Sequence, residues 1–190
     1  MKQLEEKILA EGKVLPGEIL KVGSFLNQNI DTQLLGQMAQ EIARLFEGHR
    51  ITKVLTIEAS GIAIATAVGL TMGVPVLFAK KHKTSNVDGS VYSTRVHSFT
   101  HNEDYNVVVS RDYLTADEKV LLVDDFLANG KALDGLIDLC NQAGAELVGV
   151  AIAIEKCFTG AGDRLRAQGV KLESLALIES MTEDAVVFRS

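Results

Sequence analysis

The segment KVLLVDDFLANGKALDGLIDLC, residues 119–140, decides the fold class. Four apolar residues, 120–123, are followed by Asp124 and Asp125, by the loop FLANG, and then by apolar residues at helical spacing. A continuous apolar run is typical of a strand that is buried on both faces of a parallel sheet. The segment therefore predicts a strand that ends at the two aspartates, a tight turn, and a helix that begins near Lys131.

The same strand and helix pattern recurs along the chain. Apolar strands are predicted at KVLTIE (53–58), VPVLFAKK (74–81) and ELVGVAIAIEK (146–156), and helices at 31–49 and 62–73. Strands that alternate with helices predict an α/β fold with a parallel core sheet flanked by helices. Ligands of such sheets bind at the carboxyl ends of the strands. The candidate binding loops therefore follow Ile57, Phe78, Val123 and Ile154.

Three segments fall outside this alternation. Residues 1–11 are expected to form a short helix with Leu4, Ile8 and Leu9 on one face, and residues 14–31 to be irregular. Residues 80–119 are polar, with β-rich patches at 90–99 and 105–110 that predict an antiparallel pair. We expect one domain over residues 1–190, in which 80–119 is a long, flexible, β-rich insertion of the kind that lines or covers a site.

Composition disfavours several classes of function. The net charge of −6 repels the phosphates of nucleic acids, so we expect no nucleic-acid partner. Cys140 and Cys157 lack metal-ligand spacing with the four histidines, so we expect free thiols and no protein-held metal site. The N-terminus has no apolar signal core, and the longest apolar run is too short to span a bilayer. We expect a soluble, cytoplasmic protein with no membrane partner.

The opening segment also carries candidate chemistry. A helix that begins near Lys131 offers free N–H groups and a partial positive charge, which suit a phosphate, and Gly130 lets the backbone approach closely. Asp124 and Asp125 can accept hydrogen bonds from neighbouring hydroxyls. A phosphate on one side and vicinal hydroxyls on the other describe a ribose 5-phosphate. The alternative is that the aspartates only cap the junction between strand, loop and helix.

These residues also carry a family resemblance. VLLVDDFLANGKA resembles the phosphoribosyl-pyrophosphate (PRPP) motif of type I phosphoribosyltransferases: an apolar strand, two acids and a small-residue phosphate loop. LPGEILKVGSFLNQNID, TIEASGI and IAIEKCF extend the resemblance over nearly the whole chain, toward the branch of the family that acts on xanthine. The phosphate loop departs from the broad family because it lacks the usual threonine. The expected clamp is therefore the backbone, with Asn129 and Lys131 as side-chain substitutes.

The resemblance implies the type I phosphoribosyltransferase fold and a reaction. The 5-phosphoribosyl group of PRPP would pass to xanthine, giving xanthosine 5′-phosphate (XMP) and pyrophosphate, with Mg²⁺ carried by the pyrophosphate. Asp124 and Asp125 would hold the ribose hydroxyls near the developing cation. The residues implied to bind PRPP are Ala128, Asn129, Gly130, Lys131 and Ala132 in one loop, Ala59, Ser60 and Gly61 in another, and Lys81. For the loop at 59–61 an ordinary strand-to-helix turn is the alternative, and for Lys81 a solvated basic loop.

The resemblance also implies where the base binds. Lys156 would recognise the 6-oxo group, because an ammonium donates hydrogen bonds and cannot accept them. Leu20 and Asn27 would contact xanthine from a base-covering segment, residues 1–32, which we term the hood. Without the resemblance, Lys156 reads as a surface charge and Asn27 as a turn residue. Phe158 is either a stacking partner of the base or a core aromatic.

Two other functions fit the same fold. One is a PRPP-sensing purine regulator; only about thirty residues precede the first long helix, which is short for an added DNA-binding domain. The other is a phosphoribosyltransferase for guanine or hypoxanthine, which only assays of the bases can separate. Because related enzymes are dimers, a homodimer is also expected, with the insertion or the helix at 33–48 as its interface.

Overall fold

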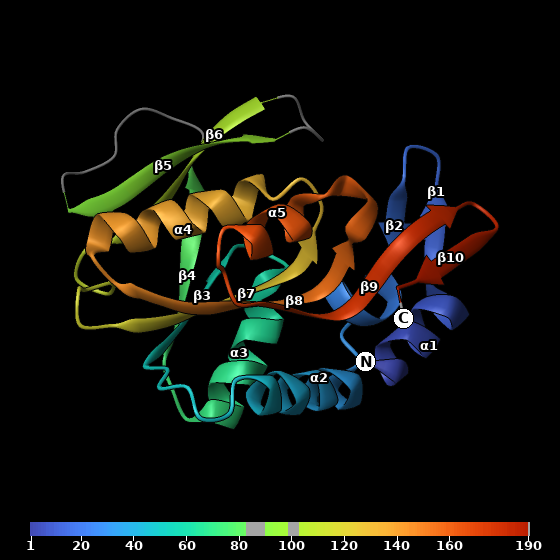
Figure 1. Cartoon of the computed structure of the whole chain (residues 1–190), viewed down its shortest axis with the longest axis horizontal. Coiled ribbons are helices and arrows are strands. Elements are labelled where there is room, and N and C mark those ends of the chain that lie inside the picture. The colour runs from blue at the N-terminus through green and yellow to red at the C-terminus, as the bar shows by residue number, and fades with distance from the viewer. Residues whose placement is uncertain (83–89, 99–102, 190) are drawn as a thin grey trace.

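The computed structural model of the protein describes residues 1–82, 90–98 and 103–189 (Figure 1). An eight-stranded sheet has the strand order β10-β9-β8-β7-β3-β4-β6-β5. Its parallel part contains β9 (Leu172–Thr182), β8 (Glu146–Lys156), β7 (Lys119–Leu127), β3 (Lys53–Ile57) and β4 (Val76–His82). The predicted parallel core sheet is therefore confirmed by the strand pairing, and the apolar runs of the central strands β3, β7 and β8 are buried.

Antiparallel strands extend the sheet at both edges. At one edge β6 (Glu103–Ser110) pairs with β4, and β5 (Val91–Ser98) pairs with β6. This is the antiparallel pair expected within 80–119, although residues 83–89 and 99–102 of that segment lie outside the described residues. At the other edge β10 (Ala185–Phe188) pairs with β9. Neither β9 nor β10 was predicted from the sequence pattern.

Helices cover the two faces of the sheet. In Figure 1, α4 (Lys131–Ala143) and α5 (Ala161–Ala167) lie above the sheet, and α2 (Thr32–Leu45) and α3 (Gly61–Met72) lie below it. Each face encloses its own apolar cluster. The start of α2 is fixed by Asp31, whose carboxylate accepts from the N–H groups of Gln33 and Leu34 at 3.2 and 3.1 Å. Among the described residues, no helix is long and apolar enough to cross a membrane.

The N-terminal segment is more ordered than the sequence predicted. Helix α1 (Lys2–Glu11) forms as expected and buries Leu4 and Ile8, but Leu9 is 60% exposed and does not share their face. Residues 14–31 are not irregular. They contain most of the hairpin of β1 (Lys13–Leu15) and β2 (Ile19–Lys21), and a short π-helix, η1 (Gly23–Asn27). Strands of three residues are too short to show a period, which is why the pattern was missed.

Strand β7 also differs from the prediction, because it does not end at the aspartates. It pairs with β8 as far as Leu127 opposite Glu155, so the loop before α4 is only Ala128–Gly130. The alternation of side chains shifts within the strand. Val123 and Phe126, three residues apart, both pack on the α2–α3 side, whereas Leu122 and Leu127 pack on the α4 side. Asp124 and Asp125 are the two residues between Val123 and Phe126, where the alternation changes.

Candidate active site

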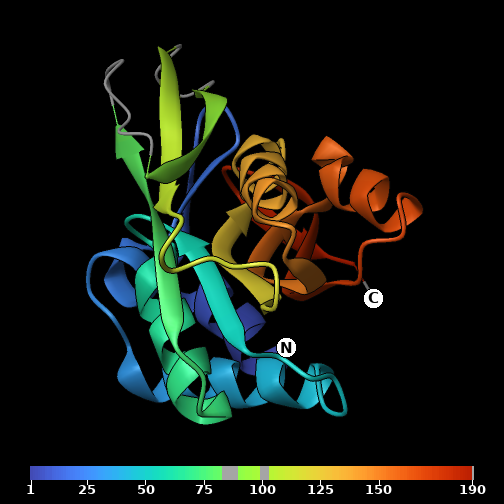
Figure 2. The same ribbon diagram turned by 90° about the vertical axis from the view of Figure 1, so that its left-hand side faces the viewer.

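The carboxyl ends of the parallel strands meet at one edge of the sheet, and the predicted site residues gather there. Figure 1 shows β7 and β8 ending near the start of α4, with the β1–β2 hairpin beyond the end of β8. Figure 2 shows the β5–β6 pair rising from this same end of the molecule. The edge is therefore flanked by the hairpin on one side and by the β5–β6 pair on the other.

The two aspartates are buried side by side. Asp124 and Asp125 are each 7% exposed. The Asp124 carboxylate accepts from the Asp125 N–H at 2.9 Å, and the Asp125 carboxylate accepts from the Phe126 N–H at 3.0 Å. Neither forms a salt bridge within the part of the chain that the structure describes. Burial, followed by the charge of Asp125, raises the pKa of Asp124 well above its ordinary value, and the charge of Lys81 opposes the shift.

The loop after β3 approaches Asp124 closely. A Cβ atom on Gly61 would lie 2.1 Å from the Thr56 hydroxyl oxygen and 2.8 Å from Asp124 Oδ1, so only glycine fits at the first residue of α3. The Thr56 hydroxyl is buried and has no hydrogen-bond partner among the described residues. Ser60 precedes α3 without capping it through its side chain. The structure therefore brings Ala59, Ser60 and Gly61 next to the aspartates.

Strand β4 places the basic residue Lys81 beside this loop. The Glu58 carboxylate accepts from the Lys81 backbone N–H at 2.5 Å, and the Lys81 ammonium lies 5.4 Å from the centre of the Tyr105 ring. Tyr105 is half-buried, and burial with the charge of Asp124 raises its pKa. Sequence reasoning missed Tyr105, because only the pairing of β6 with β4 brings it to the site.

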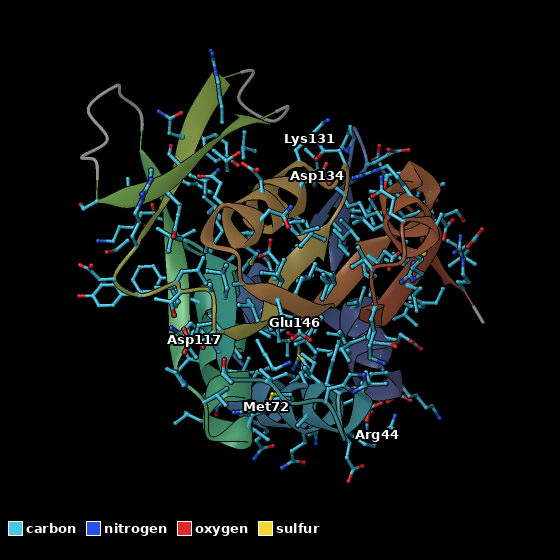
Figure 3. The ribbon with its side chains drawn as sticks, turned by 60° about the vertical axis from the view of Figure 1, so that its left-hand side comes forward. Arg44, Met72, Asp117, Lys131, Asp134 and Glu146 are labelled. Atoms are coloured by element: carbon cyan, nitrogen blue, oxygen red, sulfur yellow. The ribbon has the colours of Figure 1, made fainter. Side chains whose placement is uncertain are left out.

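The loop Ala128–Gly130 leads into α4 and presents the first N–H groups of that helix. Gly130 has φ +79°, and a Cβ there would meet Arg164 and Ala161 at 3.0 and 3.2 Å. Asn129 Oδ1 accepts from the Lys131 N–H at 3.1 Å, while the Lys131 side chain is exposed. Figure 3 shows Lys131 and Asp134 close together at the start of α4. The N–H groups of a first helical turn lack acceptors within the helix, so they can receive an anion.

Lys156 lies between the end of β8 and the hairpin. Its ammonium donates to the Glu18 carbonyl oxygen at 2.7 Å and lies 5.9 Å from the centre of the Phe126 ring. Burial lowers the pKa of Lys156, and the charge of Glu18 opposes the shift. Leu20 is buried in β2, two residues after Glu18. Lys156 is therefore a half-buried donor beside an aromatic ring, and not a free surface charge.

Two residues expected near the base, Phe158 and Asn27, are exposed. The structure places Phe126, not Phe158, beside Lys156; Phe158 is 37% exposed in the short helix η2 (Cys157–Thr159) and is not a core residue. Phe126 could have been found if β7 had been read as continuing past the aspartates. Asn27 is exposed at the last residue of η1, and no hydrogen bond joins its side chain to Lys156 among the residues described.

The arrangement accommodates a ligand of three parts. An anion fits the first turn of α4, neighbouring hydroxyls fit the two carboxylates, and a ring with carbonyl oxygens fits the donor Lys156 beside Phe126. A second anion fits the loop at residues 59–61 next to Lys81.

Comparison with known sequences identifies relatives over the full length. A family model described as phosphoribosyl transferase domain matches residues 22–173. The chain is 51% identical to a xanthine phosphoribosyltransferase of Finegoldia magna over an alignment of 188 residues. This alignment covers 99% of each chain. It is 52% identical over 192 residues to a xanthine phosphoribosyltransferase of Bifidobacterium longum, which covers 100% of both. A protein of Clostridium botulinum named xanthine phosphoribosyltransferase 2 is 52% identical over 190 residues, again 100% of both.

Solved structures show the same fold. An adenine phosphoribosyltransferase of Giardia lamblia, complexed with 9-deazaadenine, superposes with a TM-score of 0.78 at 22% identity, over 94% of this chain and 98% of that one. The adenine phosphoribosyltransferase of Saccharomyces cerevisiae gives 0.73 at 17% identity, over 92% and 99%. These likenesses establish the type I phosphoribosyltransferase fold that the sequence predicted.

Because Asp124 is buried, we expect the stability of the protein to depend on pH in a specific way. A carboxylic acid with a raised pKa in the folded state binds protons more readily than in the unfolded state, so the stability of the protein falls as pH rises from the unfolded pKa through the folded one. Asp124→Asn removes this loss and keeps an oxygen that can accept from the Asp125 N–H. We expect a higher melting temperature than wild type at pH 7, and a difference that shrinks below about pH 3.8, the ordinary aspartate pKa.

Asp117→Asn provides a control of opposite sign. Asp117 is exposed and accepts from the Thr115 hydroxyl at 2.6 Å, which lowers its pKa. Its stabilising effect is present above the unfolded pKa and is lost as pH falls, so Asp117→Asn should lower the melting temperature at pH 7. A melting temperature of Asp124→Asn below that of wild type at pH 7 would show that burial of this carboxylate does not cost stability.

Proposed function

The chain belongs to the phosphoribosyltransferase family, and we propose that it transfers the 5-phosphoribosyl group of PRPP to xanthine, releasing XMP and pyrophosphate. One observation carries the proposal. The buried aspartate pair, the first turn of α4 and the donor Lys156 lie at or just after the carboxyl ends of the neighbouring strands β7 and β8, which supports their assignment to ribose hydroxyls, 5-phosphate and base. Half of the residues are shared with relatives that bear this name.

The 5-phosphate of the sugar binds to the loop at 128–132. The N–H groups of the first turn of α4 and the positive end of the helix favour a phosphate dianion. Gly130 is favoured here because its φ is positive, and a Cβ would also make tight contacts with Arg164 and Ala161. Lys131, exposed at the first residue of α4, adds its charge.

Asp124 and Asp125 hold the ribose. Each carboxylate accepts one backbone N–H, and its remaining acceptor capacity suits a sugar hydroxyl. Positive charge develops on the ribose ring as the bond to pyrophosphate breaks. Two carboxylates fixed beside the ring stabilise that charge without having to reorganise at the moment of reaction.

Pyrophosphate leaves toward the loop at 59–61. The backbone N–H groups at the start of α3 and the ammonium of Lys81 stabilise the charge that the leaving group develops. Members of the family generally use PRPP as its Mg²⁺ complex. A Mg²⁺ ion bound with pyrophosphate would supply charge neutralisation there. Asp124 and Asp125 fit such an ion, because they offer carboxylate oxygens with no salt-bridge partner among the described residues, and Mg²⁺ commonly combines one or two carboxylates with substrate phosphates.

Lys156 selects the base. An ammonium has three protons and no lone pair, so it binds a carbonyl oxygen and leaves an exocyclic amine unsatisfied. The Glu18 carbonyl takes one of these protons and fixes the direction of the others. Phe126 supplies an aromatic face beside the ammonium, and Leu20 an apolar surface from the hood at residues 1–32. Asn27 can both donate and accept, as an edge with two oxo groups requires.

A homodimer is part of the proposal. Leu70, Phe78 and Tyr113 are large apolar residues with 81%, 40% and 63% of their surface exposed. Phe78 lies on β4, and with Val76, Val91 and Val108 it lines a groove on the face of the sheet beyond α3. A second copy of the chain packed on this face would bury these residues.

The first test is pyrophosphate release with PRPP and Mg²⁺ and with xanthine, hypoxanthine, guanine or adenine in separate reactions. We expect the highest kcat/KM with xanthine, and by far the lowest with adenine, which carries an amine where Lys156 requires an oxygen. Release that is fastest with guanine or hypoxanthine would assign the other oxopurine as substrate. Binding of PRPP without release with any base would favour a PRPP-sensing regulator.

A second test replaces the lysine. Lys156→Met keeps the length of the side chain and removes the donor, so we expect kcat/KM for xanthine to fall about 10- to 100-fold, as for a lost hydrogen bond to a charged group. The KM for PRPP should change little. Lys171→Met is the matched control, since the Lys171 ammonium also lies over an aromatic ring, 5.2 Å from the centre of Phe46, away from the site. An unchanged kcat/KM for xanthine relative to adenine in Lys156→Met would remove Lys156 from base recognition.

A further inference from the structure

One hydroxyl joins the two loops that hold the two parts of the nucleotide. Thr159 Oγ1 lies 2.6 Å from the Ala128 carbonyl oxygen and 2.8 Å from the Lys156 carbonyl oxygen. A hydroxyl has a single proton, so the two carbonyls share one donor. Ala128 begins the phosphate loop, and Lys156 is the residue assigned to the base.

The position of Thr159 explains why such a link is needed. The last pair of the β7–β8 ladder is Leu127 with Glu155, and beyond it the two strands diverge into different loops. The Ala128 carbonyl therefore has no partner strand, so its donor is either water or a side chain, and the exposed Thr159 hydroxyl lies within hydrogen-bond distance. Thr159, at the end of η2, supplies that donor from the chain that follows β8. The hydroxyl therefore links the two segments one residue beyond the last strand pair.

The segment that carries Thr159 is itself held firmly. Arg166 of α5 forms two hydrogen bonds, at 2.8 and 2.7 Å, with the fully buried carboxylate of Glu155, to which the Ser174 hydroxyl also donates. Arg164 forms two more, at 2.8 and 3.0 Å, with Asp134 in the first turn of α4. These contacts join the end of β8 to α5, and α5 to the start of α4, which follows the phosphate loop.

We propose that Thr159 is a positioning residue that keeps the phosphate loop and Lys156 at the spacing of a nucleoside monophosphate. The proposal rests on the function proposed above. A ligand that occupies both loops needs them in register, whereas a ligand that occupies one loop can bind wherever that loop settles. Loss of the Thr159 hydroxyl should therefore weaken XMP and leave ribose 5-phosphate nearly unaffected.

Calorimetric titration of Thr159→Val with both ligands tests this. Valine has the shape of threonine without the hydroxyl. We expect the Kd for XMP to rise about fivefold or more, the effect of one net hydrogen bond, and the Kd for ribose 5-phosphate to stay within about twofold of wild type. Thr159→Ser keeps the hydroxyl and should restore XMP binding. Thr159→Ala serves as a second variant without the hydroxyl if valine does not fold.

Thr71→Val is the control variant, since the Thr71 hydroxyl donates to the Ala67 carbonyl at 2.9 Å on α3, on an exposed part of the molecule. Its Kd for XMP should equal that of wild type. Equal weakening of both ligands in Thr159→Val would mean that Thr159 supports the phosphate loop alone, and no weakening of either would mean that the hydroxyl has no role; either result overturns the proposal. Failure of wild type to form XMP from xanthine would instead overturn the proposed function.

Discussion

Two carboxylates buried next to one another, with no cation paired to either among the described residues, set the constraint on which the site depends. Asp124 and Asp125 are held by backbone N–H groups, and burial raises the pKa of Asp124. Burial of two adjacent carboxylates costs free energy of folding, and neighbouring residues accommodate them. Gly61 gives Asp124 room, and a shift in the alternation of β7 places both acids between Val123 and Phe126. Under the proposed function, hydroxyl groups and a cation bound at the site would offset this cost.

The remaining parts of the site follow from the sheet. Parallel strands end at one edge, so the loops after β3 and β7 present the starts of α3 and α4 to the same ligand, and β8 presents Lys156. Catalysis in this arrangement is a matter of position and electrostatics, because no side chain has to form a covalent bond. The spacing between the loops then becomes decisive. Contacts that lie behind the site, such as those of Thr159 and Arg164, acquire importance for that reason.

The sequence predicts the parts that depend on local pattern. Apolar runs identified β3, β4, β7 and β8 with the helices between them, and the acid pair before a small-residue loop predicted the candidate site. Parts that depend on distant pairing were missed: β7 continues to Leu127 only because β8 is long enough to pair with it, and Phe126 gains its place by that extension. Tyr105 and Thr159 reach the site through β6 and η2, which no spacing along the chain reveals. The β1–β2 hairpin was too short to show a period.

The central claim, that the aspartates hold the vicinal hydroxyls of the ribose, is tested most directly by removing the hydroxyls and the carboxylates in turn. Calorimetry would measure the Kd of XMP and of its 2′,3′-dideoxy analogue for wild type, Asp124→Asn and Asp125→Asn. The account predicts that wild type binds XMP at least about tenfold more tightly than the analogue, and that the difference largely disappears in both variants. A difference that persists undiminished in both variants would mean that the hydroxyls are held elsewhere and would contradict the account.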